Sequence, residues 1–254
     1  MKKLLCLLAI ISVSIFGACS DDSAIIVDPP LENRFYPLST TAFSEFRTVV
    51  LGENNTELTA SEEIITRSWS NGGTFFGASG RREFTTYNDG TIDTGYVSNV
   101  NNMVHWHQSP FELPGLAANR IMPEWVKIAD FGNTTGWTIL NDSLKGLRFE
   151  ADTNWRFNGL VTKTALKGGM VNVVYGNNET VSAREFTYVT TFNGTVVLDS
   201  LSTAPLQFML HERTYFAENI GLVKYEQDFT NVEIMSERYP VYGYRIELIR
   251  RGVR

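Results

Sequence analysis

The sequence predicts a mainly β fold: one curved antiparallel sheet, in the form of a half-barrel or open barrel, with one irregular insertion and little helix. Apolar and polar residues alternate with period two over much of the chain from residue 35 onward, and short turn signals separate several of these runs. Short turns imply antiparallel pairing, because a parallel pair needs a crossover of about a dozen residues or more. With no fixed-period repeat and no break in composition, we expect residues 34–254 to form a single β-rich domain.

The order of the expected strands follows the chain. They span residues 43–50, 64–69, 82–87, 91–97, 147–151, 155–164, 170–175, 184–192, 195–198, 207–216, 221–229 and 242–251. Asn88-Asp89-Gly90 and Asn193-Gly194 have the residues of tight hairpin turns. Eight large aromatic residues are expected to supply most of the core volume: Trp137, Trp155, Phe157, Tyr188, Phe192, Tyr215, Phe216 and Tyr225.

The irregular insertion is expected at residues 101–146. Pro110, Pro114 and Pro123 interrupt this stretch, and residues 115–118 could form one short helix before Pro123.

The first residues have the pattern of a secretory signal. Lys2 and Lys3 precede an apolar run at residues 4–16, which is shorter than the roughly 20 residues that span a bilayer. Gly17-Ala18-Cys19 then resembles the bacterial lipoprotein box, with Phe16 in place of the usual aliphatic residue. The resemblance implies a signal peptide at residues 1–18 and a lipid on Cys19, which becomes the mature N-terminus. The alternative is that Cys19 is an ordinary signal-peptide or spacer cysteine.

Residues 19–33 are expected to form the lipidated cysteine and a flexible tether, because they are acidic and contain a Pro-Pro pair. Ser20-Asp21-Asp22 resembles the acidic export signal of Bacteroidota-type lipoproteins, which implies display on the outer face of the outer membrane. The alternatives are that these aspartates belong to a soluble spacer or retain the protein at the inner membrane. The protein could also face the periplasm. The only other cysteine, Cys6, is removed with the signal, so neither a disulfide nor cysteine catalysis is expected.

The charge of the chain argues against nucleic acid as a partner. It has 22 basic and 28 acidic residues, and loss of Lys2 and Lys3 changes the net charge from −6 to −8. A surface of this sign does not attract nucleic acid or anionic headgroups non-specifically.

Three segments carry a further resemblance. FYPLS at residues 35–39, TVSAREFTYV at 180–189 and TYFAENIGLVKYE at 214–226 are similar to segments of bacterial lipoproteins, although Arg184 and Asn219 stand where glycine is usual. This resemblance implies a curved antiparallel half-barrel like that of the LolA and LppX carriers, whose concave face can hold an apolar ligand. It brings no catalytic residues with it.

His105-Trp106-His107 is the triplet with the clearest chemical potential. On a strand, residues i and i+2 point to one face, so the two imidazoles could share a metal with His211 or Glu212 as a third ligand. The alternative is that two polar histidines flank a core tryptophan. Apart from these residues, no serine elbow, phosphate loop or other catalytic motif is present, and no cofactor is expected.

Three Asp-Ser pairs are each followed by a small or apolar residue. They resemble the periplasmic O-glycosylation site of Bacteroidota-type bacteria, which would place glycans on Ser23, Ser143 and Ser200. The alternative is chance occurrence, with Ser143 and Ser200 in turns.

These features favour a membrane-anchored binding or accessory lipoprotein. Its partners would be the membrane, through the N-terminal lipid, and an apolar ligand, a glycan or an envelope protein on the concave β face. A metal-dependent hydrolase that uses His105 and His107 is one alternative, and a purely structural envelope or adhesion component is another.

Overall fold

A computed structural model describes residues 34–111, 116–117, 122–132, 134–149, 155–198 and 202–253. Strands make up most of these residues, and their one helical element is a single 3₁₀ turn, η1 (Glu53–Asn55). None of the helical structure in the described ranges is long and apolar enough to cross a membrane. The predicted mainly β fold is therefore confirmed.

The strands, in chain order, are β1 (Ala42–Leu51), β2 (Glu57–Trp69), β3 (Gly73–Phe75), β4 (Ala78–Thr86), β5 (Ile92–Ser98), β6 (Met103–Gln108), β7 (Leu116–Ala117), β8 (Glu124–Asp130), β9 (Gly136–Phe149), β10 (Arg156–Tyr175), β11 (Glu179–Val197), β12 (Thr203–Ala217), β13 (Gly221–Gln227), β14 (Thr230–Ile234), β15 (Glu237–Val241) and β16 (Gly243–Val253).

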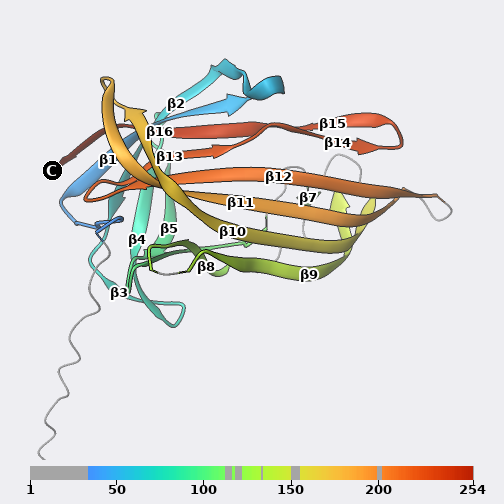
Figure 1. The fold of residues 1–254 in the computed structure, drawn as a ribbon, viewed down its shortest axis with the longest axis horizontal. Helices are drawn as coiled ribbons and strands as arrows, with labels where there is room; N and C mark the ends of the chain where they lie inside the picture. Colours follow the sequence, from blue (N-terminus) through green and yellow to red (C-terminus); the bar gives the residue numbers. More distant parts are fainter. Residues whose placement is uncertain are drawn as a thin grey trace, which may run out of the picture. The chain divides into compact units, whose positions relative to one another are not determined.

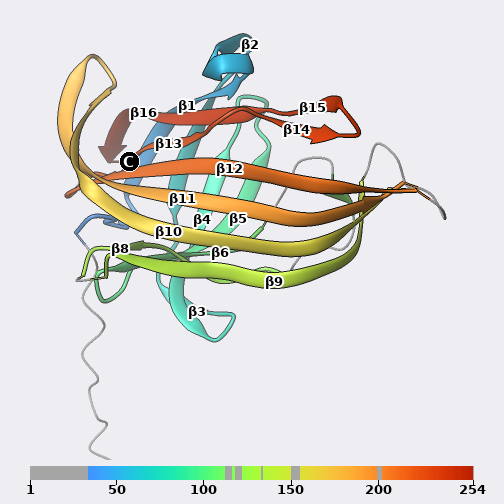
Figure 2. The ribbon, with the colours of Figure 1, turned by 45° about the vertical axis from the view of Figure 1, so that its right-hand side comes forward.

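One large antiparallel sheet contains nearly all of these strands (Figure 1). Its order is β7-β9-β10-β11-β12-β13-β16-β1-β2-β4-β5-β6-β8, with β3 paired to β4 beside this path. The first strand of the body, β1, thus pairs with the last, β16, in the middle of the sheet. The hairpin of β14 and β15 forms a separate two-stranded sheet that lies along β12, as Figure 2 shows.

The sheet curves until its edges nearly meet, which leaves one seam, between β8 and β9. Across this seam, Trp137 Nε1 on β9 donates to the carbonyl of Lys127 on β8 at 2.9 Å. In the interior, the hydroxyl of Tyr188 on β11 donates to the carbonyl of Ile128 on β8. The Lys127 ammonium also lies 4.8 Å from the Trp137 ring centre. The curved, open-barrel sheet expected from the sequence is confirmed in this form.

The segment before β1 packs into the sheet interior. Tyr36 is 3 % exposed, and its ring centre lies 5.7 Å from that of Phe216. The backbone N–H of Asn219 donates to the carbonyl of Arg34 at 2.7 Å, and a Cβ on Gly221 would lie 3.5 Å from the Tyr36 ring. Two of the segments that resemble those of bacterial lipoproteins, 35–39 and 214–226, therefore contact each other.

Two apolar clusters stabilise the body. The larger cluster joins strands from both halves of the sheet around Phe46, Val97, Phe186 and Phe216. The second lies between the far halves of β9 to β12 and the β14–β15 hairpin, and includes Phe157, Phe192, Leu206, Val232 and Val241. Of the eight aromatic residues expected in the core, five are buried and three are partly buried against these clusters.

The turn at Asn88-Asp89-Gly90 is confirmed between β4 and β5, and Gly90 has a positive φ of 84°. The turn expected at Asn193-Gly194 is wrong, because both residues lie inside β11. Gly194 faces Gly159 of β10 so closely that a Cβ on Gly194 would lie 2.6 Å from the Gly159 Cα. The close approach of two strands, rather than a turn, explains this glycine.

The insertion is also more regular than its prolines suggest. Residues 101–146 contain β6, β8 and most of β9, and the short helix expected at 115–118 is wrong, since Leu116–Ala117 form a strand that pairs with β9.

Candidate functional site

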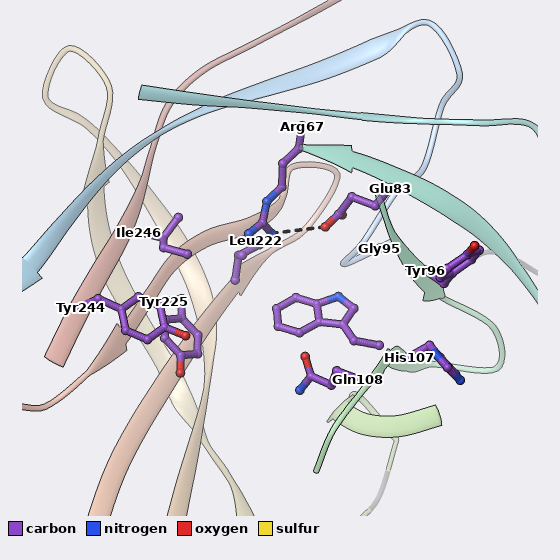
Figure 3. A pocket seen from close by; sticks show the side chains of 11 residues that line it. Arg67, Glu83, Gly95, Tyr96, His107, Gln108, Leu222, Tyr225, Tyr244 and Ile246 are labelled. Carbon is purple, nitrogen blue, oxygen red and sulfur yellow. Dashed lines mark ion pairs between the residues drawn. The ribbon is translucent and has the colours of Figure 1, made fainter. Parts of the chain in front are cut away.

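A cavity of about 290 Å³ lies inside the curved sheet. Strands β2, β4, β5 and β6 form one wall, and β13 and β16 form the other (Figure 3). Its lining combines aromatic rings with a few polar groups: Arg67, Glu83, Gly95, Tyr96, Trp106, His107, Gln108, Leu222, Tyr225, Tyr244 and Ile246. The Tyr244 side chain is exposed, which places it where the cavity meets solvent. We refer to this space as the main cavity.

An ion pair forms the polar part of the main cavity wall. Arg67 Nη1 lies 3.5 Å from Glu83 Oε1, and these side chains are only 13 % and 12 % exposed. Glu83 Oε2 accepts hydrogen bonds from the Tyr36 hydroxyl at 3.0 Å and from Trp69 Nε1 at 2.9 Å. Two hydrogen-bond donors and the Arg67 guanidinium, from β2 and from the segment before β1, therefore hold the Glu83 carboxylate in place.

Burial and these contacts determine the protonation states of Tyr36 and Arg67. Burial raises the pKa of Tyr36 well above its ordinary value, and the charge of Glu83 raises it further, so the phenol stays a neutral donor. Burial lowers the pKa of Arg67, but the charge of Glu83 and the contacts with Tyr36 and Tyr244 together outweigh burial and leave that pKa raised. The guanidinium therefore remains positively charged.

Two buried N–H groups in the same wall lack an acceptor. Neither Arg67 Nε nor Trp106 Nε1 has a hydrogen-bond partner among the described residues. A buried donor without a partner costs about 1–3 kcal/mol, and most buried polar groups in native proteins are satisfied. Both nitrogens are shielded from solvent, so a molecule in the main cavity does not reach them.

A second polar cluster lies beyond Trp106 and Tyr225, which also line a smaller cavity of about 20 Å³. In it, Lys163 Nζ lies 2.7 Å from Glu212 Oε1, and each side chain is 13 % exposed. The Tyr225 hydroxyl donates to Glu212 Oε2 at 2.8 Å. Burial raises the pKa of Tyr225, and the Glu212 charge adds to the effect, so Tyr225 is also a neutral donor.

The predicted pair of histidines lies on β6, as expected, but in aromatic surroundings. The ring of His107 stacks on Phe76 at a centre distance of 3.8 Å, with Tyr96 and Trp125 around it. In Figure 3, Tyr96 and His107 point away from the centre of the main cavity. Burial and the charge of Lys127 lower the pKa of His105.

The third histidine, His211, lies on β12 opposite Val189. Within the described ranges, no group of three or more His, Cys, Asp or Glu side chains could hold a metal ion. The structure therefore does not bring His105, His107 and His211 together as one ligand set, and a metal at these residues stays a prediction.

The remaining predicted sites lie mostly outside the described residues. This holds for Cys19, for Ser20, Asp21 and Asp22 of the export signal, and for Ser23 and Ser200. Ser143 lies on β9 with an exposed side chain, and its backbone N–H donates to Asp142 Oδ1 at 2.7 Å. Lipidation, export and glycosylation therefore remain predictions.

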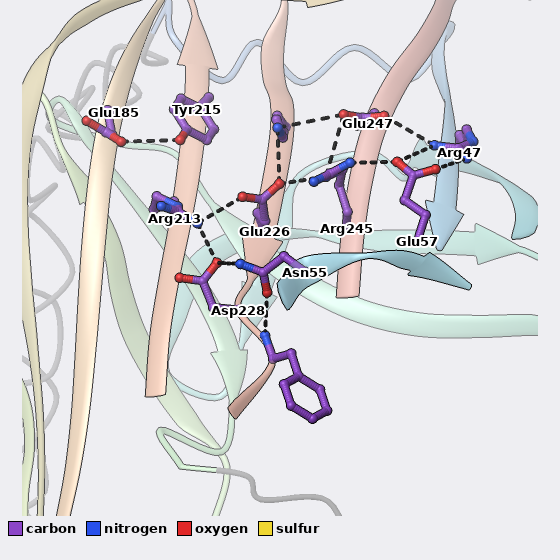
Figure 4. Close-up of polar contacts among 12 residues, drawn as sticks. Arg47, Asn55, Glu57, Glu185, Arg213, Tyr215, Glu226, Asp228, Arg245 and Glu247 are labelled. Atoms are coloured by element: carbon purple, nitrogen blue, oxygen red, sulfur yellow. Dashed lines mark hydrogen bonds and ion pairs between the residues drawn. The ribbon is translucent and has the colours of Figure 1, made fainter. Parts of the chain in front are cut away.

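The opposite face of the sheet carries a ladder of alternating charges (Figure 4). Arg245 on β16 joins Glu226 of β13 at 2.5 Å to Glu57 of β2 at 2.6 Å, and Arg47 on β1 binds the other oxygen of Glu57 at 2.6 Å. Arg213 on β12 extends the ladder to Glu226 at 2.9 Å. These pairs connect five strands, β12, β13, β16, β1 and β2, and the Arg245–Glu57 pair reaches across β1. Successive residues of a strand point to opposite faces, so Tyr225 lines the cavity and Glu226 belongs to the ladder.

Sequence reasoning missed Arg67, Glu83 and Gln108 as cavity residues. A usable signal was present for one of them, because Arg67 stands between Ile65 and Trp69 at the apolar positions of an alternating strand. A charge at such a position faces the interior and needs a partner there.

Comparison with known proteins gives two structural likenesses. A candidate lipoprotein from Parabacteroides distasonis has a TM-score of 0.48 at 10 % identity, over 87 % of this chain and 100 % of its own. A candidate exported protein with a YmcC-like fold from Bacteroides fragilis has a TM-score of 0.45 at 11 % identity, over 87 % of this chain and 99 % of its own. No protein-family model and no curated protein matches the chain.

Proposed function

We propose that this protein is a membrane-anchored binding lipoprotein that holds a compact ligand in the main cavity. In this proposal the lipid on Cys19 attaches the chain to the membrane, residues 19–33 separate the body from it, and the sheet supplies the binding site. The export signal Ser20-Asp21-Asp22 favours the outer membrane as the location.

The observation that carries the proposal is the composition of the main cavity. Aromatic rings from β6, β13 and β16 surround it, and a buried ion pair and an amide are its polar groups. Ligand sites are typically concave and mostly apolar, with a small number of placed polar groups.

The composition of the cavity restricts the class of apolar ligand that the sequence led us to expect. The volume of the cavity is at the lower end of ligand sites, and Arg67 and Glu83 in its wall disfavour a long acyl chain. A small ligand with both polar groups and an apolar face suits the lining better.

A variant that fills the cavity tests the proposal. Gly95 lines the cavity, and the nearest atom to an added Cβ is the Glu83 carbonyl at 4.0 Å, so a larger side chain has room to enter. Gly169→Leu is the matched control, because nothing lies within 4 Å of an added Cβ there. The full chain is extracted from its native membrane in mild detergent and its mass is measured under native conditions.

We expect wild type and Gly169→Leu to carry an added small-molecule mass, and Gly95→Leu to lack it. An added mass that survives in Gly95→Leu would place the ligand elsewhere and contradict the proposal. Thermal unfolding of both variants shows whether the body is intact.

A further inference from the structure

We infer that the ligand of the main cavity is a neutral carbohydrate of about one sugar ring; this inference rests on the proposed function. The size, the charge and the polar groups of the cavity each restrict the ligand, and a single class satisfies all three.

Size is the first restriction. The volume of about 290 Å³ is at the lower end of ligand sites, which measure about 300–1,000 Å³. A compact molecule such as one sugar ring with its substituents therefore suits the cavity better than a long chain.

Charge is the second restriction. The wall has one cation, Arg67, and one anion, Glu83, and they pair with each other. Tyr36 and Trp69 donate to the same carboxylate, so Glu83 is not available as a free counter-charge. A ligand with a net charge would leave one charge in the wall without compensation, which is strongly unfavourable in a buried setting. A neutral ligand leaves the pair balanced.

The third restriction is the combination of rings and hydrogen-bonding groups. Tyr225 and Tyr244 stack at a centre distance of 4.9 Å, and with Trp106 they form the apolar part of the lining. The C–H groups on one side of a sugar ring are weakly positive and pack on the negative faces of aromatic rings. Each sugar hydroxyl both donates and accepts, so it can pair with either the oxygen or the nitrogen of the Gln108 amide.

Other compact ligands fit fewer of these features. A fatty acid brings a carboxylate but no hydroxyl groups, and a uronic acid has the ring and the hydroxyls but also a charge. A planar aromatic compound stacks on the rings but offers few groups for the Gln108 amide. These three classes therefore serve as comparison probes.

The test measures binding of each probe to the full chain in detergent by isothermal titration calorimetry. The neutral probes are glucose, galactose, mannose and N-acetylglucosamine; the comparison probes are glucuronate, octanoate and indole. We expect at least one neutral sugar to bind saturably. Glucuronate is expected to bind at least about tenfold more weakly, because its carboxylate would leave one charge in the wall without compensation.

Two variants locate the binding. Gln108→Ala is expected to weaken the sugar about tenfold, and Gly95→Leu to abolish binding. Gln207→Ala is the control, because Gln207 is exposed on β12 and donates only to Asn193 at 3.1 Å.

The outcomes separate the ligand class from the proposed function. If glucuronate, octanoate or indole binds more tightly than every neutral sugar, the carbohydrate class is wrong. The class is also wrong if no sugar binds while the membrane-extracted chain carries a mass that Gly95→Leu removes, and in that case the binding function stands. If Gly95→Leu changes neither the carried mass nor the binding of any probe, both proposals fail.

Discussion

The buried pair of Lys163 and Glu212 offers a quantitative test of the polar interior. Their charged atoms lie 2.7 Å apart, and Glu212 also accepts from the Tyr225 hydroxyl at 2.8 Å. Lys163→Met removes the cation and leaves the carboxylate with one neutral donor. Removing one partner of a buried ion pair typically costs about 3–5 kcal/mol, because the remaining charge is uncompensated. We expect this loss in the free energy of unfolding of Lys163→Met.

The double variant Lys163→Met/Glu212→Leu gives the contrasting result. With both charges replaced by apolar groups of similar volume, the free energy of unfolding is expected within about 1 kcal/mol of wild type or above it. Urea unfolding followed by fluorescence measures both. With a slope of about 2 kcal/mol per molar urea, the single variant lowers the midpoint by roughly 1.5–2.5 M. A midpoint shift below about 0.5 M in the single variant would refute the reasoning, since the pair would then behave as an exposed one.

Three further predictions concern the strand contact, the acid stability and the anchor. Gly194→Ala brings a Cβ to within 2.6 Å of the Gly159 Cα and is expected to lower the free energy of unfolding by about 1–3 kcal/mol, measured by urea unfolding. The control Gly169→Ala, at an open position, should leave this free energy unchanged or slightly raised. Equal effects of the two substitutions would contradict the close contact. Burial raises the pKa of Glu226, but its contacts with Arg245 and Lys224 together outweigh burial and leave that pKa lowered. The stability from ionised Glu226 is therefore complete above its unfolded pKa of about 4.3 and is lost as pH falls through the folded pKa. Glu226→Gln should flatten the dependence of the urea midpoint on pH below about 4.3, and an unchanged slope would count against these ion pairs. Cys19→Ser is expected to move the chain from the detergent phase to the aqueous phase on phase separation and to remove the lipid mass, and continued partition into detergent would exclude Cys19 as the anchor.

The fold could be predicted from the sequence because the patterns that indicate strands and turns are local. Alternation with period two marks the strands, and Asn88-Asp89-Gly90 marks one turn that the structure contains. Asn193-Gly194 has an equally strong local signal and still lies inside β11, because β10 and β11 continue to pair beyond it through Gly159 and Gly194. Strand register, which is a property of two distant segments, decides between a turn and a close contact.

The residues of the cavity were harder to predict from the sequence, again because strand register brings them together. Arg67 and Glu83 meet because β2 pairs with β4, where Trp69 lies opposite Glu83, and nothing local to either residue states this register. Gln108 ends β6 and faces the cavity only because β6 pairs with β5 and β8. His105 and His107, in contrast, stood out by residue type, yet the structure surrounds His107 with aromatic rings.

The arrangement of the polar interior supports a binding role over a purely structural one. A buried ion pair adds little stability compared with apolar side chains of the same volume, and the ladder of charges on the outer face already connects β2, β1, β16, β13 and β12. The interior pairs, Arg67 with Glu83 and Lys163 with Glu212, are therefore not needed to hold the strands together. They lie on either side of Trp106 and Tyr225, beside the two cavities that these rings share. Charges kept at a cost in stability and placed around an interior space are typical of a site that orients a ligand.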